Sequence, residues 1–432
     1  MAMVVKNNMS ALSTLNTLNR NTTALSKSLQ KVSSGMKINS AADDASGYAI
    51  SERMRVQIRS LDQANSNAQN GGSMMKVAEG AVSSTVEILK TLKEKAVNAA
   101  NDTNTDADRA TIQKEMDQSI DQINDNANVT FNGQYLVDGS KNKEVHQTTT
   151  AMTNQSLNTA TAGTAGLTDL KARNGDSLNI HSTDTVTISY VKDGKTYTSS
   201  TQVGTNTLSG VISDLTSGAV TVRSTSSQIG MDSSLNTVNT ASGDSAITIA
   251  SSTSGIDGQV AGFTMYITDN KGNVNKSANA ALDAFDESIR AQNKSEDNSI
   301  VMQVGTKAGQ SIKVGLTDMK AQALGLQGKN GETLSIGNQE KANAAINVLD
   351  AAIQKALDQQ TTIGAVESRL EYTQSNLTTA SENVTAAEST IRDADMAKEM
   401  TEYTKNNVLM QAAQSMLAQA NQSSSNALSL LQ

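Results

Sequence analysis

The chain has 432 residues, a formal net charge of -8 and no cysteine, and aromatic residues make up only 2% of it. The negative charge argues against a nucleic-acid-binding surface, and the lack of cysteine excludes disulfides and thiol chemistry. Large cores usually depend on aromatic side chains for buried area, so this composition favours slender layers of Ala, Leu, Met, Ile and Val. No segment approaches the roughly 18 consecutive apolar residues of a membrane span, and residues 1–6 hold no apolar signal-peptide core. We therefore expect neither membrane insertion nor a cleaved signal.

Proline is absent, although average usage would give about twenty residues in a chain of this length. Proline breaks helix interiors, and isomerisation of its peptide bond slows refolding. A chain without proline suits long helices and a protein that has to unfold and refold quickly.

The first segment, residues 4–36, repeats apolar residues at alternating steps of four and three. This alternation is the seam of a left-handed coiled coil, and a helix of this length would measure about 50 Å. Such a helix buries too little surface to be stable alone. The seam positions with apolar side chains are Val4, Ala11, Leu15, Leu18, Leu25, Leu29, Val32 and Met36.

A second, longer heptad pattern begins after a break at residues 37–47, where Ser40 and the pair Asp43–Asp44 are candidate helix caps. It predicts a long helix to about residue 100. Its main seam residues are Met54, Leu61, Met75, Val82 and Leu89.

A third helix is predicted at about residues 106–126, and Phe131–Tyr135, with Asn132–Gly133 at its centre, has the pattern of a β-hairpin. From about Lys141 the sequence becomes rich in Ser, Thr, Gly and Asn and carries short alternating runs such as Thr185–Tyr190. These runs predict a β-rich insertion over residues 141–297, closed by a helix at residues 280–292. A further hairpin pattern covers residues 300–304 and 311–314.

The last hundred residues return to a heptad pattern, which changes phase near Asp393. The seam of the longer helix contains Leu349, Ile363, Leu370, Leu377, Val384 and Ile391. The seam of the final helix contains Met396, Met400, Tyr403, Met410, Leu417, Leu428 and Leu431.

The predicted elements therefore form a palindrome of short helix, long helix, β insertion, long helix and short helix. We expect a mainly α fold with a β-rich insertion, in which the whole chain makes a hairpin of long coiled-coil-like helices. The expected domains are a terminal coiled coil (1–41 and 394–432), a helical bundle with β-hairpins (42–140 and 298–393) and an outer β-rich domain (141–297). Four unrelated amphipathic helices around one core would not account for the mirrored lengths.

No catalytic constellation stands out in the sequence. His146 and His181 are the only histidines, and zinc-helix, phosphate-loop and nucleophile-elbow motifs are absent. The acidic pairs Asp43–Asp44 and Asp393–Asp395 lie at helix junctions, where capping is the simplest role. We expect no enzyme activity, no metal and no cofactor.

Both ends of the chain resemble the signatures of bacterial flagellins. Ser33–Ala45 (SSGMKINSAADDA) is similar to the N-terminal signature, and Ile391–Glu399 (IRDADMAKE) and Leu417–Gln422 (LAQANQ) are similar to the C-terminal one. The resemblance covers residues 1–140 and 298–432. It implies a structural subunit that polymerises with itself into the flagellar filament used for motility.

The resemblance further implies a protein secreted unfolded through the flagellar export channel, extracellular in the flagellum, that folds on assembly. Its implied partners are further copies, a flagellar export chaperone, the filament cap and the hook-junction proteins. The polar seam residues Asn8, Thr22, Asn407 and Gln414 are expected to weaken the terminal pair but to fix its register.

Two features depart from the family pattern. Gln422–Asn426 replaces the proline that commonly precedes the last apolar run, which leaves open a continuous final helix. Where strong activators of the flagellin-sensing Toll-like receptor carry Arg, Leu and Gln, this chain has Thr91, Lys95 and Asn98, so we expect weak agonism. The epitope residues implied by the resemblance are Leu89, Thr91, Leu92, Lys95, Asn98 and Glu115.

Three alternative functions have their own sequence requirements. A hook–filament junction protein shares the helical ends, and the LAQANQ run favours the filament subunit. A coiled-coil surface adhesin predicts a Sec signal or wall anchor. A metalloprotease in the insertion requires an HExxH motif, which the sequence lacks.

Overall fold

The computed structural model describes residues 8–223 and 226–429, apart from the side chains of residues 424 and 426–429. The chain forms two compact units. The first comprises the residues up to 68, residues 303–310 and the residues from 372 onward. The second comprises residues 69–302 and 311–371.

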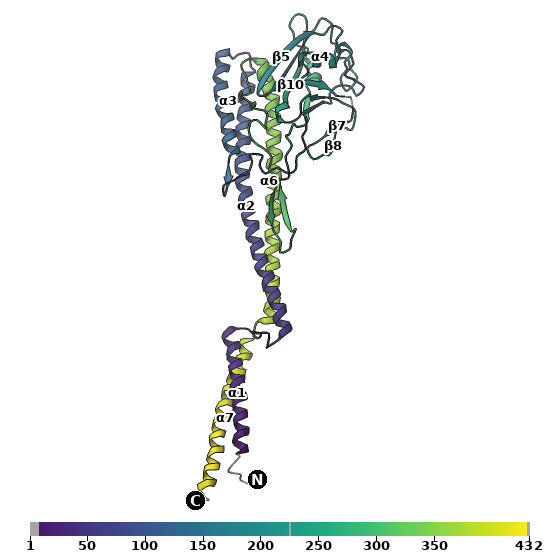
Figure 1. The fold of residues 1–432 in the computed structure, drawn as a ribbon. Coiled ribbons are helices and arrows are strands. Elements are labelled where there is room, and N and C mark those ends of the chain that lie inside the picture. The colour runs from purple at the N-terminus through teal and green to yellow at the C-terminus, as the bar shows by residue number, and fades with distance from the viewer. Residues whose placement is uncertain (1–7, 224–225, 430–432) are drawn as a thin grey trace. The chain divides into compact units, whose positions relative to one another are not determined.

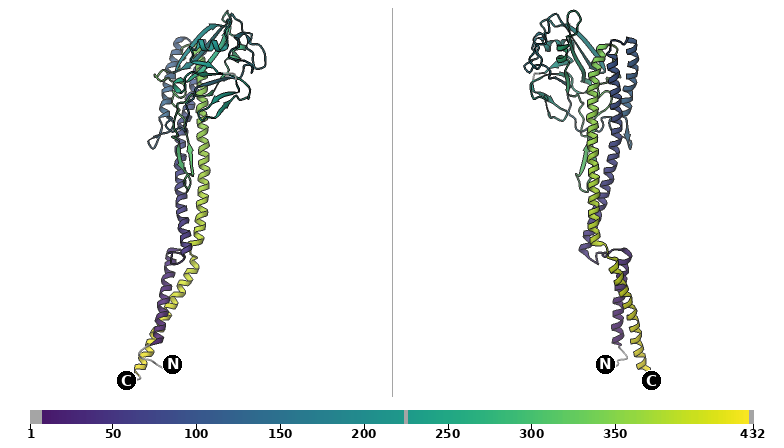
Figure 2. Two further views of the ribbon diagram at one scale, coloured as in Figure 1. Left: turned by 45° about the vertical axis from the view of Figure 1, so that its right-hand side comes forward. Right: turned by 180° about the vertical axis from the view of Figure 1, so that it is seen from behind.

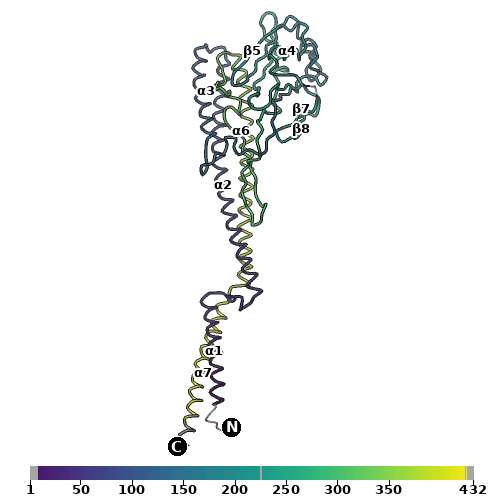
Figure 3. The backbone as a smooth tube through the Cα atoms, viewed as in Figure 1, coloured from purple at the N-terminus to yellow at the C-terminus, as the bar shows by residue number. Residues whose placement is uncertain are grey.

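The first unit contains helix α1 (Met9–Ser34), helix α7 (Met396–Ser429) and the ends of two longer helices, α2 (Ala45–Ala99) and α6 (Gln339–Arg392). Helices α1 and α7 come from opposite ends of the sequence and lie side by side, as the purple and yellow traces show (Figure 3). Helix α7 continues without a break through residues 422–426, so the continuous final helix is the form adopted. Of the predicted seam positions, Val4 and Leu431 and the side chain of Leu428 lie outside the described residues.

Helix α1 begins and ends at capping residues. The side chain of Asn8 accepts a hydrogen bond from the amide of Ala11, and Gly35 closes the helix in the left-handed conformation at φ +71°. The amide of Gly35 donates to the carbonyl of Lys31 at 2.9 Å. A glycine is favoured at this position because residues with a Cβ pay a steric cost at positive φ.

The second unit contains most of α2 and α6 together with helix α3 (Asp106–Ala127). A capping box at Thr105 and Asp108 starts α3, and Arg109 donates to the carbonyls of Ala99 and Asn101 across the α2–α3 turn. Within this unit α6 lies between the α2–α3 pair and the β-rich insertion (Figures 1 and 2).

Two short hairpins lie where the sequence predicts them. Strands β1 (Thr130–Phe131) and β2 (Gln134–Tyr135) are joined by Asn132 and Gly133, both at positive φ. Strands β12 (Ile300–Gln303) and β13 (Ser311–Val314) form the second hairpin.

The β-rich insertion contains one sheet of three strands and one of four. The three-stranded sheet has the order β10 (Val260–Thr268), β4 (Thr185–Lys192), β5 (Lys195–Gln202) and is antiparallel. The four-stranded sheet has the order β11 (Phe285–Ile289), β3 (Ala151–Asn154), β9 (Ile247–Ser251), β6 (Val220–Val222). A smaller pair joins β7 (Gln228–Met231) to β8 (Thr237–Asn239), and short 3-10 turns lie at Leu167–Asp169 and Ile256–Gly258.

The two larger sheets share one apolar core with two short helices, α4 (Leu208–Leu215) and α5 (Lys276–Leu282). Its largest fully buried side chain is Phe263, whose ring meets that of Phe285 edge-on at 5.0 Å between centroids. The predicted helix at residues 280–292 is wrong beyond Leu282, because Phe285 and Ile289 alternate into the sheet and pair with β3. Helix α4 was not predicted.

The insertion packs against α6 within the second unit. The hydroxyl of Tyr266 on β10 donates to Glu340 on α6 at 2.8 Å, and burial together with this carboxylate raises the pKa of Tyr266 to about 12. Gly262 lies so close to the carbonyl of Ala344 on α6 that a Cβ there would stand 2.4 Å from it. The insertion is thus packed against the part of α6 that belongs to the second unit, and the three-part division stays a prediction.

Candidate self-assembly surface

Helices α1 and α7 run antiparallel and are joined by polar contacts along their length. The side chain of Asn8 donates to the carbonyl of Ala420 at 3.2 Å, and that of Asn21 to the carbonyl of Leu409 at 3.2 Å. Asn406 donates to the hydroxyl of Ser28 at 3.1 Å, and the Lys31 ammonium pairs with Glu399 at 3.3 Å. These contacts fix the register of the pair. Asn8 is one of the four polar residues expected to do so, whereas Thr22 donates to the carbonyl of Leu18 in its own helix.

The side of α1 that faces α7 differs from the predicted seam. Ala11, Leu18, Leu25 and Val32 are half-buried, but Leu15 and Leu29 are exposed, with 41% and 52% of their surface accessible. The second line of residues that faces α7 consists of Thr14, Asn21 and Ser28. Each of them stands one residue before the corresponding position of the predicted seam. A two-helix pair buries one narrow face, so the second apolar line stays outside.

The α1–α7 pair therefore buries few side chains and leaves many exposed. Among its described residues only Ser28 and Ala413 are buried. On α7, Tyr403, Met410 and Leu417 are half-buried. We call the large exposed apolar side chains of these two helices the α1–α7 surface; they are Met9, Leu12, Leu15, Leu29, Met396, Met400, Val408, Leu409 and Met416.

A junction at residues 35–52 and 392–395 connects this pair to the longer helices. Gly35 accepts a backbone hydrogen bond from Ala394 at 2.9 Å, and the amide of Lys37 donates to Arg392 at 2.8 Å. The Arg392 guanidinium is buried, donates to Glu52 at 2.6 Å and lies over the ring of Tyr48. Sequence reasoning did not single out Arg392 or Glu52, because only pairing between segments 340 residues apart brings them together.

One residue of each acidic pair at this junction caps a helix, and at α2 the cap is Asp44 rather than the expected Ser40 or Asp43. Asp44 accepts from the amides of Ser46 and Gly47 at the start of α2, and Asp395 accepts from Ala397 and Lys398 at the start of α7. Hydrogen bonds from Ser40 lower the pKa of Asp43. The flagellin-like signatures thus coincide with this hydrogen-bonded junction.

The residues of the predicted bundle seam lie in or beside the core. Most are buried, whereas Met54, Val384 and Ile391 are half-buried. In the first unit Leu61 and Leu377 pack together. The buried members of this seam are Leu61, Met75, Val82, Leu89, Leu349, Ile363, Leu370 and Leu377.

The structure divides the predicted receptor epitope. Leu89 and Leu92 point into the core and are not available to a partner. Thr91, Asn98 and Glu115 are exposed, and the Lys95 ammonium pairs with Glu115 at 2.8 Å. The accessible part of the epitope is thus a polar surface with an internal ion pair.

Among residues 8–223 and 226–429 no group of His, Cys, Asp and Glu side chains is arranged to hold a metal ion. In the same residues no helix combines the length and apolarity of a membrane span. An antiparallel terminal pair with exposed apolar side chains, a helical bundle and a β-rich insertion together have the architecture of a structural protein.

Comparison with known proteins agrees with this class. Residues 5–142 match the bacterial flagellin N-terminal helical region, and residues 346–431 match the bacterial flagellin C-terminal helical region. The chain is 35% identical to a flagellin of Clostridium tyrobutyricum over 97% of this chain and 99% of that protein. It is 31% identical to a flagellin of Bacillus subtilis over 99% of this chain and all of that protein. The chain belongs to the bacterial flagellin family and is a subunit of the flagellar filament.

Among solved structures, flagellar hook associated protein-3 from Legionella pneumophila is similar at 15% identity, with a TM-score of 0.34, over 78% of this chain and 97% of that one.

Proposed function

We propose that this flagellin polymerises through the α1–α7 surface, with neighbouring copies covering the side chains that the pair leaves exposed. The observation that carries the proposal is that, among the described residues of the pair, two are buried whereas nine large apolar side chains are exposed. Large apolar side chains exposed in such number on one pair of helices are typical of an interaction surface.

Purified monomer added to sheared filament seeds tests the proposal directly. We expect electron microscopy to show seeds that lengthen with monomer concentration. A junction protein would bind a filament end without extending it, so a single terminal layer would contradict a filament-forming role.

We further infer that the chain leaves the cell unfolded through the flagellar export channel and folds on assembly. The lack of proline supports this route, because no slow isomerisation delays refolding. A pair with so little buried surface gains its stability from neighbours. Protease-resistant residues 8–36 in dilute monomer would contradict this inference.

The partners on that route are an export chaperone, the filament cap and the hook-junction proteins, and the destination is extracellular. The role is structural, without catalysis. Co-purification of the chaperone with the terminal 40 residues, and loss of secretion when they are deleted, is the expected result.

We also propose that the chain is a weak agonist of the flagellin-sensing Toll-like receptor. Thr91 lacks the guanidinium fork of an arginine, and Lys95 brings a charge into a position that is apolar in strong activators. The ion pair between Lys95 and Glu115 supports the proposal, since receptor binding has to break or bury it.

A reporter-cell assay with the triple variant T91R/K95L/N98Q tests the predicted weak agonism. We expect greater potency than that of the wild-type chain, while Lys90→Leu on the same helix leaves potency unchanged. Equal potency of the wild-type chain and a strong activator would overturn it.

A further inference from the structure

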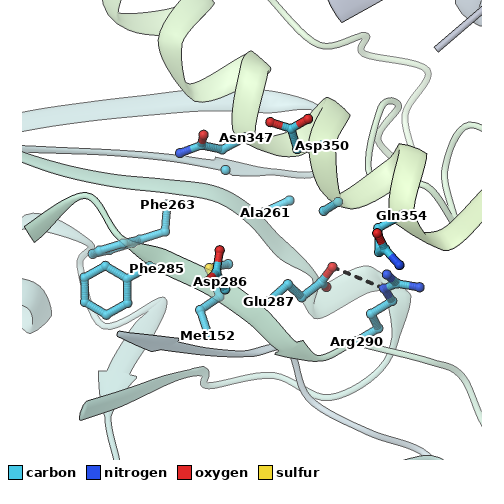
Figure 4. Close-up of a pocket in the computed structure, with 12 residues that line it drawn as sticks. Met152, Ala261, Phe263, Phe285, Asp286, Glu287, Arg290, Asn347, Asp350 and Gln354 are labelled. Atoms are coloured by element: carbon cyan, nitrogen blue, oxygen red, sulfur yellow. Dashed lines mark hydrogen bonds and ion pairs between the residues drawn. The ribbon is translucent and has the colours of Figure 1, made fainter. Parts of the chain in front are cut away.

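A cavity of about 310 Å³ lies in the second unit between strand β11 and helix α6. One part of its wall is apolar and includes Met152, Ala261 and the rings of Phe263 and Phe285 (Figure 4). The remainder is polar and comes from both sides, with Asp286, Glu287 and Arg290 at β11 and Asn347, Asp350 and Gln354 on α6. Volumes near 300 Å³ lie at the lower end of the range for small-molecule sites.

Several polar groups in this wall have no partner in the described part of the chain. The Asp286 carboxylate and the Asn347 amide make no hydrogen bond or ion pair there, although Asp286 is exposed at the strand surface. Asp350 bonds Lys93 through Oδ1 only, which leaves Oδ2 free. Glu287 is 11% exposed, and its buried Oε1 has no hydrogen-bond partner.

Negative charge dominates the free groups. Arg290 is the one cationic residue in the wall, and its guanidinium is shared between Glu287 and Asp358, each at 3.4 Å. The groups left over include carboxylate oxygens and the amide oxygen of Asn347, and such hydrogen-bond acceptors recognise a cation.

The shape of the site favours an extended organic cation over a metal ion. Within the described residues no three acidic or histidine side chains converge on one point. The carboxylates instead lie on opposite walls, on β11 and on α6, with Ala261 between them and the rings of Phe263 and Phe285 to one side (Figure 4). A ligand that satisfies both walls carries positive charge at two ends and hydrocarbon in the middle.

We propose that this cavity binds an alkyl diamine. One ammonium group pairs with Asp286 and the other with the free oxygen of Asp350. The methylene chain lies against Met152, Phe263 and Phe285, where it is removed from water.

Titration calorimetry on full-length monomer at constant ionic strength tests this assignment. The probes are 1,4-diaminobutane, 1,5-diaminopentane, 1-butylamine and magnesium chloride. We expect saturable binding of the diamines at one site, at least about tenfold weaker binding of butylamine, and no saturable binding of magnesium, because one charge-assisted hydrogen bond contributes about a tenfold difference.

The variants Asp286→Asn and Asp350→Asn should each weaken diamine binding at least about tenfold. Asp214→Asn removes an exposed carboxylate from α4 in the same insertion, away from the cavity, and should leave binding unchanged. Circular dichroism checks that each variant keeps the wild-type helix content. If Asp350→Asn does not fold, the diamine affinity of Asp286→Asn alone tests the proposal.

Three results would overturn the proposal. They are equal affinity for butylamine and diaminobutane, equal weakening by Asp214→Asn, and wild-type affinity in Asp286→Asn. The absence of saturable diamine binding at about 10 mM ligand would do so as well, since that corresponds to a binding free energy of only about 3 kcal/mol.

Discussion

Arg392 at the end of α6 donates from Nη1 to Oε1 of Glu52 near the start of α2, at 2.6 Å. The guanidinium also lies over the ring of Tyr48, 5.3 Å from its centroid. A second pair, Arg55 with Glu388 at 3.0 Å, lies beside it. Together these contacts hold the two long helices at the point where each meets a terminal helix.

Substitution of Arg392 by Met should lower the free energy of unfolding by about 2 kcal/mol, because it removes a charge-assisted hydrogen bond whose donor is buried. Glu52→Gln should cost less, since the Glu52 side chain is 42% exposed. Urea unfolding measures both. An equal cost for the two variants would mean that the cation–π contact with Tyr48 contributes nothing.

The same pair predicts an acid dependence of stability. The hydrogen bond from Arg392 lowers the pKa of Glu52. A carboxyl whose folded pKa is lowered contributes stability above its unfolded pKa, and this contribution is lost as pH falls through the folded pKa. Unfolding measured between about pH 5 and 2 should therefore show a shallower loss in Arg392→Met than in wild type.

Gly47 in the first turn of α2 allows close contact at the same junction. A Cβ there would stand 2.5 Å from Oδ2 of Asp44 and 2.7 Å from Cδ1 of Ile38. Gly47→Ala should thus disturb the cap and lower the free energy of unfolding by about 1–3 kcal/mol.

Gly80 in the same helix is the matched control. It is exposed, and a Cβ there would meet nothing within 4 Å. Gly80→Ala should raise the free energy of unfolding by about 0.5–1 kcal/mol through helix propensity alone. Thermal unfolding followed by circular dichroism should therefore show shifts of opposite sign, and shifts of the same sign would contradict the assignment.

The heptad pattern predicted the long helices and the partnership of the two ends, because apolar periodicity sustained over many turns is typical of helices that bury one face. It did not determine which face of α1 meets α7. One line of the contact face consists of Ala11, Leu18, Leu25 and Val32. The second line can lie three positions further on, at Thr14 and Asn21, or four positions further on, at Leu15 and Thr22. The polar choice is made by hydrogen bonds to α7, such as that of Asn21 to Leu409, which the sequence pattern cannot reveal.

The strand β11 was missed for a different reason. Residues 276–284 are rich in Ala and favour a helix, and the change to alternation falls within the next five residues. Pairing with β3 overrides the local preference there. The cavity beside β11 arises from strands and a helix that are distant in sequence, so no local motif announces it.

Lys355 on α6 is half-buried, and its ammonium group donates to the carbonyl of Ala323 at 2.8 Å. Burial lowers the pKa of Lys355 to about 8 from its ordinary value of 10.5. Between these values the unfolded chain binds more protons than the folded one, so the free energy of unfolding should rise with pH across this window.

Lys355→Met should abolish that rise and stabilise the protein at pH 7 by about 2 kcal/mol. The pKa shift of Lys355 corresponds to a destabilisation of about 3 kcal/mol, which the substitution removes. Loss of the hydrogen bond to Ala323 offsets about 1 kcal/mol of this gain. Urea unfolding at pH 7 and pH 10 measures both effects. Lys114→Met, at an exposed position on α3, should change neither.

Leu29 is half exposed on α1, on the side that α7 leaves uncovered. If neighbouring copies cover it in the filament, its burial contributes about 1.5–3 kcal/mol to assembly. Leu29→Gln should slow the extension of seeds at least about tenfold at a fixed monomer concentration, with the circular dichroism of the monomer unchanged. Lys27→Gln, at an exposed polar position nearby, should extend seeds at the wild-type rate. Light scattering on seeded samples measures the rate, and wild-type extension by Leu29→Gln would show that this side of α1 stays in solvent in the filament.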